Sequence, residues 1–253
     1  MSFLSSKKSF ISSGLLDNMT DIHSHILFGV DDGVRGFEEA VASLRWMKSL
    51  GINRIYLTPH IMCDFPKNTS EYLSESFRLL IKRLTNDGID DIPELRLSAE
   101  YMLEPTIEKH KSDGFLSYNN RHILIETSYI NPPIGLAKLL EELMEDGYSP
   151  ILAHPERYFY MDKNDYDFLI GQGIKFQLNI LSLTGAYGRI AKDKALFLLN
   201  ECYYNYAGSD FHNLERHRDH FSTKCLTKKN IDSLKHIIDN NNNLWSPSYR
   251  TVY

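Results

Sequence analysis

From residue 19 onward, short runs of apolar and β-branched residues alternate with longer segments whose apolar residues recur at helical spacing. This alternation predicts parallel β-strands joined by helical crossovers. The expected strands lie near residues 19–23, 54–58, 95–101, 122–127, 149–154, 175–181 and 204–209. The expected helices lie near residues 37–50, 71–86, 134–146, 166–172 and 190–200. Several of these segments end in glycine, which suits the left-handed position after a helix, namely Gly51, Gly88 and Gly147.

About seven strand–helix units fit one α/β domain in a chain of 253 residues. That many units allow a closed or nearly closed parallel barrel, whereas an open doubly wound sheet would place its ligand at a single switch point. No repeat or linker divides the chain. We expect an N-terminal extension over residues 1–19, one domain over residues 20–245 and a C-terminal tail over residues 246–253.

Composition excludes several classes of protein. The formal charge of −5 is mild, and Lys and Arg form no basic stripe, so nucleic acid is not an expected partner. No apolar run approaches the roughly 18–20 residues of a membrane span, and the N-terminal apolar run is broken by serines, unlike a signal peptide. A soluble cytoplasmic protein without membrane insertion is expected. Three cysteines without CxxC spacing are expected to be buried thiols: Cys63, Cys202 and Cys225.

Most of the expected strands end in a residue type that binds metal ions. These residues are His23, His25, His60, Glu100, Glu126, His154, Asp210 and His212. Alternate residues of an extended segment point the same way, so each of the two closely spaced pairs can reach one ion. A single histidine is usually structural or on the surface, but the recurrence of ligand types at the catalytic edge of a barrel favours a metal centre. The other histidines are expected to be structural or on the surface: His110, His122, His217, His220 and His236.

The expected ligands are imidazole nitrogens and carboxylate oxygens, which suit Mn²⁺, Fe²⁺ or Zn²⁺. They are too many for one structural zinc ion, so two or three ions with bridging carboxylates are expected. Such a cluster polarises a phosphoryl oxygen and lowers the pKa of a bound water, so hydrolysis of a phosphate ester is its natural use. Arg157 and Arg216 follow closely on expected ligands, and a guanidinium binds phosphate in a bidentate way; the alternative for each is a surface salt bridge.

These residues lie in motifs that resemble the polymerase and histidinol phosphatase (PHP) superfamily. The resemblance is closer to its bacterial branch of metal-dependent protein-tyrosine phosphatases associated with capsular and exopolysaccharide synthesis. The matching stretches recur in family order and cover residues 20–33, 57–60, 99–100, 125–127, 153–158 and 208–213.

The resemblance implies a distorted (β/α)₇ TIM-like barrel of the PHP type with a site for two or three divalent ions, Mn²⁺ first among the candidates and Fe²⁺ or Zn²⁺ as alternatives. It implies a tyrosine phosphatase whose substrate is a phosphotyrosyl protein, a tyrosine kinase of polysaccharide assembly. It implies phosphate contact by Arg157 and Arg216. The ligand set that it implies is His23, His25, Asp32, His60, Glu100, Glu126, His154, Asp210 and His212.

The sequence departs from the pattern of the branch at one position and is ambiguous at another. Members of the branch often read Thr-Pro-His-His, but here Ile61 follows His60. Either the second histidine is not a ligand or the site is altered in this chain, and we favour the first. Asp31 and Asp32 are both available, and Asp32 is chosen for its spacing from the first histidine.

Competing functions also follow from the sequence. A cysteine-based phosphatase needs Cys-x₅-Arg, but the residues six positions after the cysteines are Thr69, Gly208 and Ile231. The remaining alternatives are a small-molecule phosphatase of the histidinol-phosphate type and a non-catalytic regulator that binds phosphotyrosine. The sequence leaves the oligomeric state open. An aromatic rim for a tyrosyl ring is a further hypothesis, formed by Tyr158, Phe159, Tyr160 and Phe211.

Overall fold

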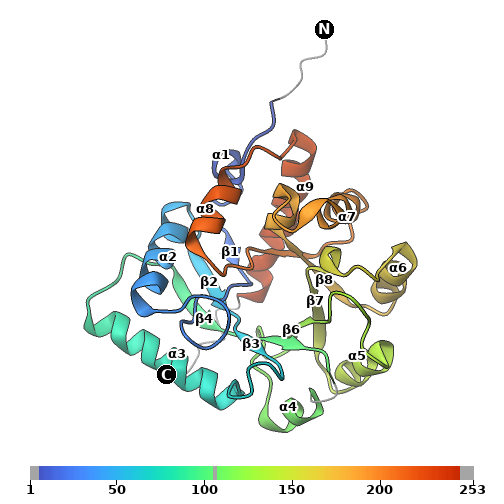
Figure 1. The fold of residues 1–253 in the computed structure, drawn as a ribbon, viewed down its shortest axis with the longest axis horizontal. Helices are drawn as coiled ribbons and strands as arrows, with labels where there is room; N and C mark the ends of the chain where they lie inside the picture. The colour runs from blue at the N-terminus through green and yellow to red at the C-terminus, as the bar shows by residue number, and fades with distance from the viewer. Residues whose placement is uncertain (1–5, 105–106, 246–253) are drawn as a thin grey trace.

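The computed structural model describes residues 6–104 and 107–245, so the expected tail 246–253 and residues 1–5 of the expected extension lie outside the described residues. Strands and helices alternate along the chain, and the helices surround the strands (Figure 1). All strand pairs are parallel. The predicted parallel α/β barrel is confirmed, whereas the boundaries of the expected domain stay a prediction.

Seven passes of the chain form the barrel, and two of them are divided. The strands are β1 (Thr20–Asp21), β2 (Arg54–Leu57), β3 (His60–Ile61), β4 (Glu94–Leu97), β5 (Glu100–Met102), β6 (His122–Glu126), β7 (Ser149–Ala153), β8 (Lys175–Asn179) and β9 (Tyr206–Gly208). They pair in the orders β1-β2-β4 and β3-β5-β6-β7-β8-β9. Pro59 lies between β2 and β3 and has no N–H for the ladder. The expected strand 95–101 is divided into β4 and β5, and β3 follows the expected strand 54–58 as a separate short strand.

The barrel closes between its first and last strands by a few contacts rather than a ladder. Ser24 and Phe211 form an isolated parallel bridge, and the His25 N–H donates to the Phe211 carbonyl at 2.8 Å. The Asp210 N–H donates to the His23 carbonyl at 2.8 Å. The segments that carry the first two and the last two expected ligands therefore lie side by side at this seam.

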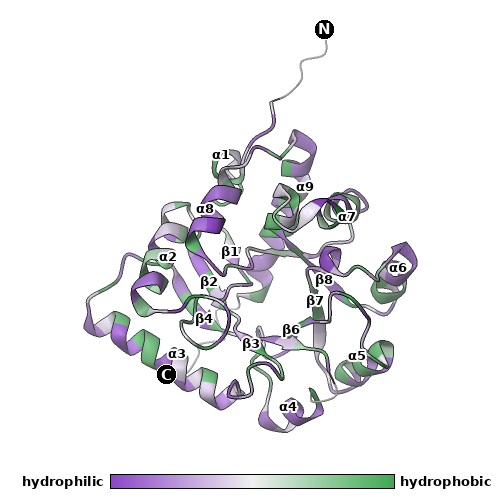
Figure 2. Cartoon of the chain, viewed as in Figure 1, coloured by the Kyte–Doolittle hydropathy of each residue, from purple (hydrophilic) through white to green (hydrophobic). Residues whose placement is uncertain are grey.

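Nine α-helices of the described residues cover the barrel. They are α1 (Phe10–Ser13), α2 (Phe37–Ser49), α3 (Ser70–Asn86), α4 (Ile107–Asp113), α5 (Leu136–Glu145), α6 (Lys163–Gly171), α7 (Gly188–Asn200), α8 (Leu214–Ser222) and α9 (Lys228–Asn240). The five expected helices are present with shifted ends, and the glycines after three of them have φ angles of 94°, 64° and 88°. Helix α8 was not expected because only His217 and Phe221 of it are buried. Figure 2 shows hydrophilic and hydrophobic residues on the surrounding helices, as expected for amphipathic helices over a core.

The alternation of side chains along the strands separates two apolar clusters. Ile55 and Leu57 of β2 belong to the large cluster that includes the buried residues of the helices. Tyr56, between them in the sequence, belongs to a smaller cluster with Leu124 and Ile151. This second set therefore faces the inside of the barrel, because successive residues of a strand point to opposite faces. Among the described residues, no helix combines the length and apolar character that crossing a membrane requires.

Candidate metal centre

The inner row of the strands leads directly to the expected ligands. His60 lies two residues after Thr58 and four after Tyr56, which faces the inside of the barrel, so these residues share one face of the pass through β2 and β3. Glu126 likewise lies two residues after Leu124 at the end of β6. Polar ligand types thus replace apolar residues at the carboxyl end of the barrel.

Glu100 lies at the centre of the cluster and contacts four imidazoles. Its Oε2 lies 3.1 Å from His23 Nε2, 3.3 Å from His25 Nε2 and 3.2 Å from His60 Nδ1. Its Oε1 lies 3.0 Å from His154 Nε2. Glu100 is 1% exposed, so these contacts form in the interior of the protein.

The ligand atoms converge on three overlapping positions. Within each group the candidate ligand atoms lie within 4.8 Å of one another; the groups are His23, His25, Glu100 and Asp210; His25, Asp32, His60 and His212; and His60, Glu100 and Glu126. His154 lies beside the third group through its contact with Glu100. The structure therefore brings together all nine side chains of the expected ligand set. Three of them, His25, His60 and Glu100, belong to two groups each, as bridging or neighbouring ligands of clustered ions would.

The two aspartates of the Asp31-Asp32 pair lie in different environments. Asp32 Oδ1 lies 3.5 Å from His60 Nε2 and 3.5 Å from His212 Nε2, at the exposed side of the cluster. Asp31 is behind His25 instead: its Oδ2 lies 2.8 Å from His25 Nδ1 and accepts the His60 N–H at 3.1 Å. A carboxylate on the far nitrogen of a histidine fixes the ring and makes it a stronger ligand. This geometry favours Asp32 as the ligand, with Asp31 as the support of the His25 ring.

Gln177 gives similar support on the opposite side, because its Oε1 lies 3.0 Å from His23 Nδ1. The contact turns His23 Nε2 toward Glu100 and Asp210. Gln177 was not among the expected site residues, because β8 ends in amides and carries no residue of a ligand type. The sequence did contain a sign of this role: β8 has the amides Gln177 and Asn179 near its end, where other strands are followed by histidines and carboxylates.

The imidazoles and carboxylates of the cluster shift each other's pKa values. Burial pulls the pKa of His60 down, as does His25, but the Glu126 and Glu100 carboxylates outweigh them and raise it to about 9. Burial opposes ionisation of Glu100, yet His23 and the other imidazoles hold its pKa well below the usual range. Glu100 thus stays ionised and requires positive charge around it.

Divalent cations fit this donor set. His60 Nδ1 and Glu126 Oε1 lie 2.9 Å apart, but neither atom has a hydrogen-bond partner among the described residues. His23 Nε2 and His25 Nε2 face each other at 3.2 Å. Nitrogen and oxygen atoms that converge on a common space are what metal ligands require, and imidazole with carboxylate suits Mn²⁺, Fe²⁺ or Zn²⁺.

Arg157 lies against the cluster. Its Nη1 donates to Asp210 Oδ2 at 2.8 Å, and the guanidinium lies between two aromatic rings, 4.6 Å from the Tyr129 centroid and 4.1 Å from the Tyr187 centroid. The Tyr187 hydroxyl also donates to Asp210 Oδ2 at 3.3 Å. Neither tyrosine was expected, because both are distant from Arg157 in the sequence. The rings fix the plane of the guanidinium, which matters for bidentate binding of phosphate.

Arg216 is more exposed to solvent than Arg157. It is exposed, its guanidinium lies 4.8 Å from the Tyr187 centroid, and its Nη2 donates to the Ala186 carbonyl at 3.3 Å. Arg216 thus lies over the same ring that supports Arg157. A direct contact of Arg216 with phosphate stays a prediction.

The turn that carries His154 and Arg157 is anchored from below by Glu156. Its Oε1 accepts the Asn179 N–H at 3.0 Å and the Ser182 hydroxyl at 2.7 Å, and its Oε2 accepts the Tyr204 hydroxyl at 2.9 Å. Glu156 is fully buried, and this burial raises the pKa of its carboxyl. The turn is the 3₁₀ helix η1 (Pro155–Arg157), so Glu156 ties both site residues to the end of β8.

Two candidate ligands have left-handed backbone. His154 has a φ of 35° and Asp210 a φ of 52°, a conformation that is uncommon for residues other than glycine. At both positions this conformation turns the chain where the strand ends. Such strain is typical of functional sites, where the surrounding structure holds it in place.

Several expectations from the sequence are wrong. The cysteines are not buried: Cys63 and Cys202 are exposed and Cys225 is partly exposed, because Cys63 lies in the loop after β3 and Cys202 has a φ of 60° in the turn after α7. The aromatic rim is also wrong in part, since Tyr158 and Phe211 are fully buried. The Tyr158 hydroxyl donates to the Ala153 carbonyl at 2.8 Å, so this residue supports the barrel.

Ile61 is 1% exposed and packs in the large apolar cluster. It follows His60 in β3, so its side chain points to the face opposite the candidate ligands. A side chain at this position thus contributes to the core, in agreement with the expectation that the missing second histidine is not a ligand.

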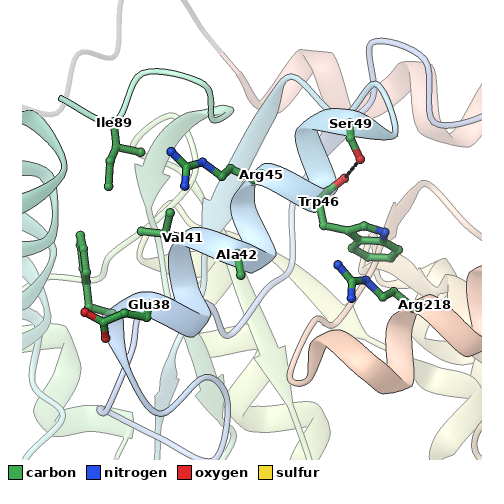
Figure 3. A pocket seen from close by; sticks show the side chains of 9 residues that line it. Glu38, Val41, Ala42, Arg45, Trp46, Ser49, Ile89 and Arg218 are labelled. Atoms are coloured by element: carbon green, nitrogen blue, oxygen red, sulfur yellow. Dashed lines mark hydrogen bonds between the residues drawn. The ribbon is translucent and has the colours of Figure 1, made fainter. Parts of the chain in front are cut away.

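A groove of about 590 Å³ on the outer face of α2 is separate from the cluster. Figure 3 shows Val41, Ala42, Arg45 and Trp46 of α2 in this groove, with Arg218 of α8 on its far side. None of its lining residues is a candidate ligand.

A parallel α/β barrel that gathers imidazoles and carboxylates at the carboxyl ends of its strands defines the class of metal-dependent barrel hydrolases. The family described as "Capsular polysaccharide synthesis, CpsB/CapC" matches residues 19–243. The chain belongs to this family.

Similar proteins support the assignment of the chain to this family. The chain is 31% identical over 212 residues to the tyrosine-protein phosphatase YwqE of Bacillus subtilis, covering 80% of each protein. It is 30% identical over 209 residues to the tyrosine-protein phosphatase CpsB of Streptococcus pneumoniae, covering 78% of this chain and 84% of that protein. Its fold matches a crystal structure from work on YwqE and CpsB, described as metal-dependent tyrosine phosphatases, with a TM-score of 0.72, 25% identity and coverage of 88% of this chain and 95% of that chain.

The loop between β1 and α2 leads to a prediction about Gly33. A Cβ atom on Gly33 would lie 2.1 Å from the His25 carbonyl oxygen and 2.5 Å from its Cβ, so Gly33→Ser must displace His25. We expect a loss of about 1–3 kcal/mol in the free energy of unfolding, as for other overpacked sites, together with weaker metal binding. Urea unfolding and metal titration measure both.

Gly36→Ser is the matched control in the same loop. A Cβ atom at Gly36 meets nothing within 4 Å, and Gly36 is the N-cap of α2, where serine is favoured. This variant should match or exceed the stability of the wild type. Equal behaviour of the two variants would contradict the close approach of Gly33 to His25.

Proposed function

We propose that this chain is a metal-dependent protein-tyrosine phosphatase, a phosphoric monoester hydrolase that removes phosphate from tyrosine residues of a protein of capsular or exopolysaccharide synthesis. The observation that carries the proposal is the largely buried cluster of nine histidines and carboxylates with Arg157 bonded to one of them. The names of the relatives support the substrate class.

The proposed metal ligands are the nine residues of the cluster, and the proposed content is two or three divalent ions, with Mn²⁺ ahead of Fe²⁺ and Zn²⁺. The three overlapping groups support this number. Bound ions would supply an activated water and charge stabilisation at the phosphoryl group. Asp31 and Gln177 hold the rings of His25 and His23 in the orientation that this requires.

The role proposed for Arg157 is to bind and orient the phosphoryl oxygens. Its side chain is 17% exposed, so it stays partly accessible while Asp210 and the two tyrosine rings hold its guanidinium. A phenolate leaving group has an ordinary pKa of about 10 and needs less help from a general acid than an alkoxide. Positioning and charge stabilisation therefore account for most of the proposed contribution of this residue.

A protein substrate also requires ligands near the surface, because a phosphotyrosine on a folded or flexible chain cannot enter a deep cavity. The side chains of Asp32 and His212 are 61% and 25% exposed. This shallow side of the cluster favours phosphotyrosine over a metabolite that needs full enclosure. We propose a tyrosine kinase of polysaccharide assembly as the physiological partner, and the cytoplasm as the compartment where the two meet.

Removal of a ligand is the first test. His23→Ala and Asp210→Ala should lower turnover of p-nitrophenyl phosphate by at least about 100-fold, the upper range found when even the supports of metal ligands are removed. The metal content per chain should fall in parallel, while circular dichroism stays that of the wild type. EDTA should abolish turnover of the wild type and Mn²⁺ should restore it.

Cys63→Ser is the control for this experiment, because Cys63 is exposed in the loop after β3 and belongs to none of the three groups. Its turnover should equal that of the wild type. Normal activity of a well-folded His23→Ala protein would exclude the metal mechanism, and inactivity of a well-folded Cys63→Ser protein would point to a thiolate.

Arg157→Lys tests phosphate binding. Lysine keeps the charge but loses the planar fork and the contacts with both rings, so kcat/KM for a phosphotyrosyl peptide should fall about 10-fold or more, the equivalent of one charged hydrogen bond. Arg189→Lys is the control, since Arg189 is exposed and pairs only with Asp193 among the described residues. If Arg157→Lys and Arg157→Ala both match the wild type, Arg157 is structural.

Substrate preference separates the proposal from its two alternatives. Under Mn²⁺, kcat/KM should be highest for phosphotyrosyl peptides, lower for phosphoseryl peptides and lowest for histidinol phosphate. A preference for histidinol phosphate would make the chain a small-molecule phosphatase with the same metal site. Tight binding of phosphotyrosyl peptides without release of phosphate would make it a non-catalytic regulator.

A further inference from the structure

The rim of the barrel carries an apolar groove between α5 and α6, two helices that lie next to each other around the barrel (Figure 1). This rim groove has a volume of about 260 Å³ and is lined mainly by Pro132, Leu136, Ala137, Tyr160, Met161 and Phe168. Sites that enclose small-molecule ligands are usually about 300–1,000 Å³. The rim groove is therefore better suited to one or two side chains of a bound peptide.

Exposed apolar residues concentrate around this groove. Nine large apolar side chains are notably exposed among the described residues, and five of them line the rim groove or lie within two residues of its lining: Ile130, Ile134, Phe159, Phe168 and Ile170, with exposures of 68%, 99%, 61%, 50% and 36%. Isolated exposed apolar residues need no explanation, but a gathering of them marks a surface that is covered by a partner.

The rim groove shares its loops with the candidate active site. The Phe159 N–H donates to the Tyr129 carbonyl at 2.8 Å, and the Tyr129 ring lies against Arg157. The Tyr160 hydroxyl lies 2.6 Å from Thr127 Oγ1, and Thr127 directly follows the candidate ligand Glu126. The two loops that place Glu126 and Arg157 in the site therefore also form one end of the rim groove.

The second loop is held rigidly in this position. Lys194 of α7 donates from its Nζ to the Tyr158 carbonyl at 2.6 Å and to the Met161 carbonyl at 2.7 Å. Asp165 is the one charged residue of the lining. Its Oδ2 accepts the Asp162 N–H at 2.8 Å as part of the N-terminal cap of α6. The groove thus offers a preformed surface that is mostly apolar, with Asp165 as its one charged residue.

We propose that the rim groove binds an apolar side chain of the substrate, close in sequence to the phosphotyrosine that occupies the metal site. The inference rests on the proposed function and adds a determinant of specificity to it. The metal cluster and Arg157 recognise the phosphoryl group, which is the same in every phosphotyrosyl protein. Discrimination among such proteins requires contacts outside that group, and the rim groove supplies an apolar one on the same two loops.

The test compares two phosphotyrosyl peptides that differ only in the residues flanking the phosphotyrosine, leucine in one and serine in the other. The wild type should favour the leucine peptide in kcat/KM by about 10-fold or more, as expected for burial of one leucine side chain. The double variant Ile134→Ser/Phe168→Ser should lose this preference. Its turnover of p-nitrophenyl phosphate should be unchanged, because neither residue belongs to the metal site.

Leu79→Ser/Ile190→Ser is the matched control, with exposed residues on α3 and α7 that lie outside the groove. It should keep the preference of the wild type. A preference that survives in Ile134→Ser/Phe168→Ser would overturn the inference, as would a concentration-dependent dimer of the wild type that this variant abolishes in light scattering. Absence of phosphotyrosine turnover in the wild type would instead overturn the proposed function, whereas turnover without any flanking preference would overturn only the role of the rim groove.

Discussion

The structure around the site depends on one buried carboxylate, Glu100, and the four imidazoles that it contacts. An ionised carboxylate in the interior costs several kcal/mol unless opposite charge surrounds it. Here the histidines supply that charge when protonated, and divalent ions supply it when they replace the protons. The same atoms therefore stabilise the folded mouth of the barrel and prepare it for metal. Metal binding and local order both depend on the positive charge that surrounds Glu100.

The barrel meets this requirement through its geometry. Alternation places His60 and Glu126 on the inner face, at the points where Tyr56 and Leu124 end the apolar interior. The left-handed backbone of His154 and Asp210 then turns two further side chains toward the same space. Support from outside the cluster comes from Asp31, Gln177 and Glu156, each of which fixes a ligand or its turn by hydrogen bonds.

The sequence was sufficient to predict those parts of the fold and site that follow from periodic patterns. Buried parallel strands and amphipathic helices have such patterns, and ligand types recur at the strand ends, so the barrel and the candidate cluster were predictable. Contacts between irregular segments were not. Tyr187 supports Arg157 from a loop far along the chain, and Tyr158 beside Arg157 turns into the core. The different environments of Asp31 and Asp32 depend on the course of their loop. The exposed cysteines were missed because thiols are common in cores, whereas loop geometry decides their burial here.

The seam between β1 and β9 can form only after most of the chain has been synthesised. Seven of the nine candidate ligands precede residue 205, but Asp210 and His212 arrive with the last strand, which closes the barrel beside His23. A nascent chain emerging from the ribosome thus carries most of the site long before it can assemble it. Until the final strand docks, several histidines and carboxylates remain without their partners, so the growing polypeptide passes most of its synthesis as an inactive, incomplete barrel.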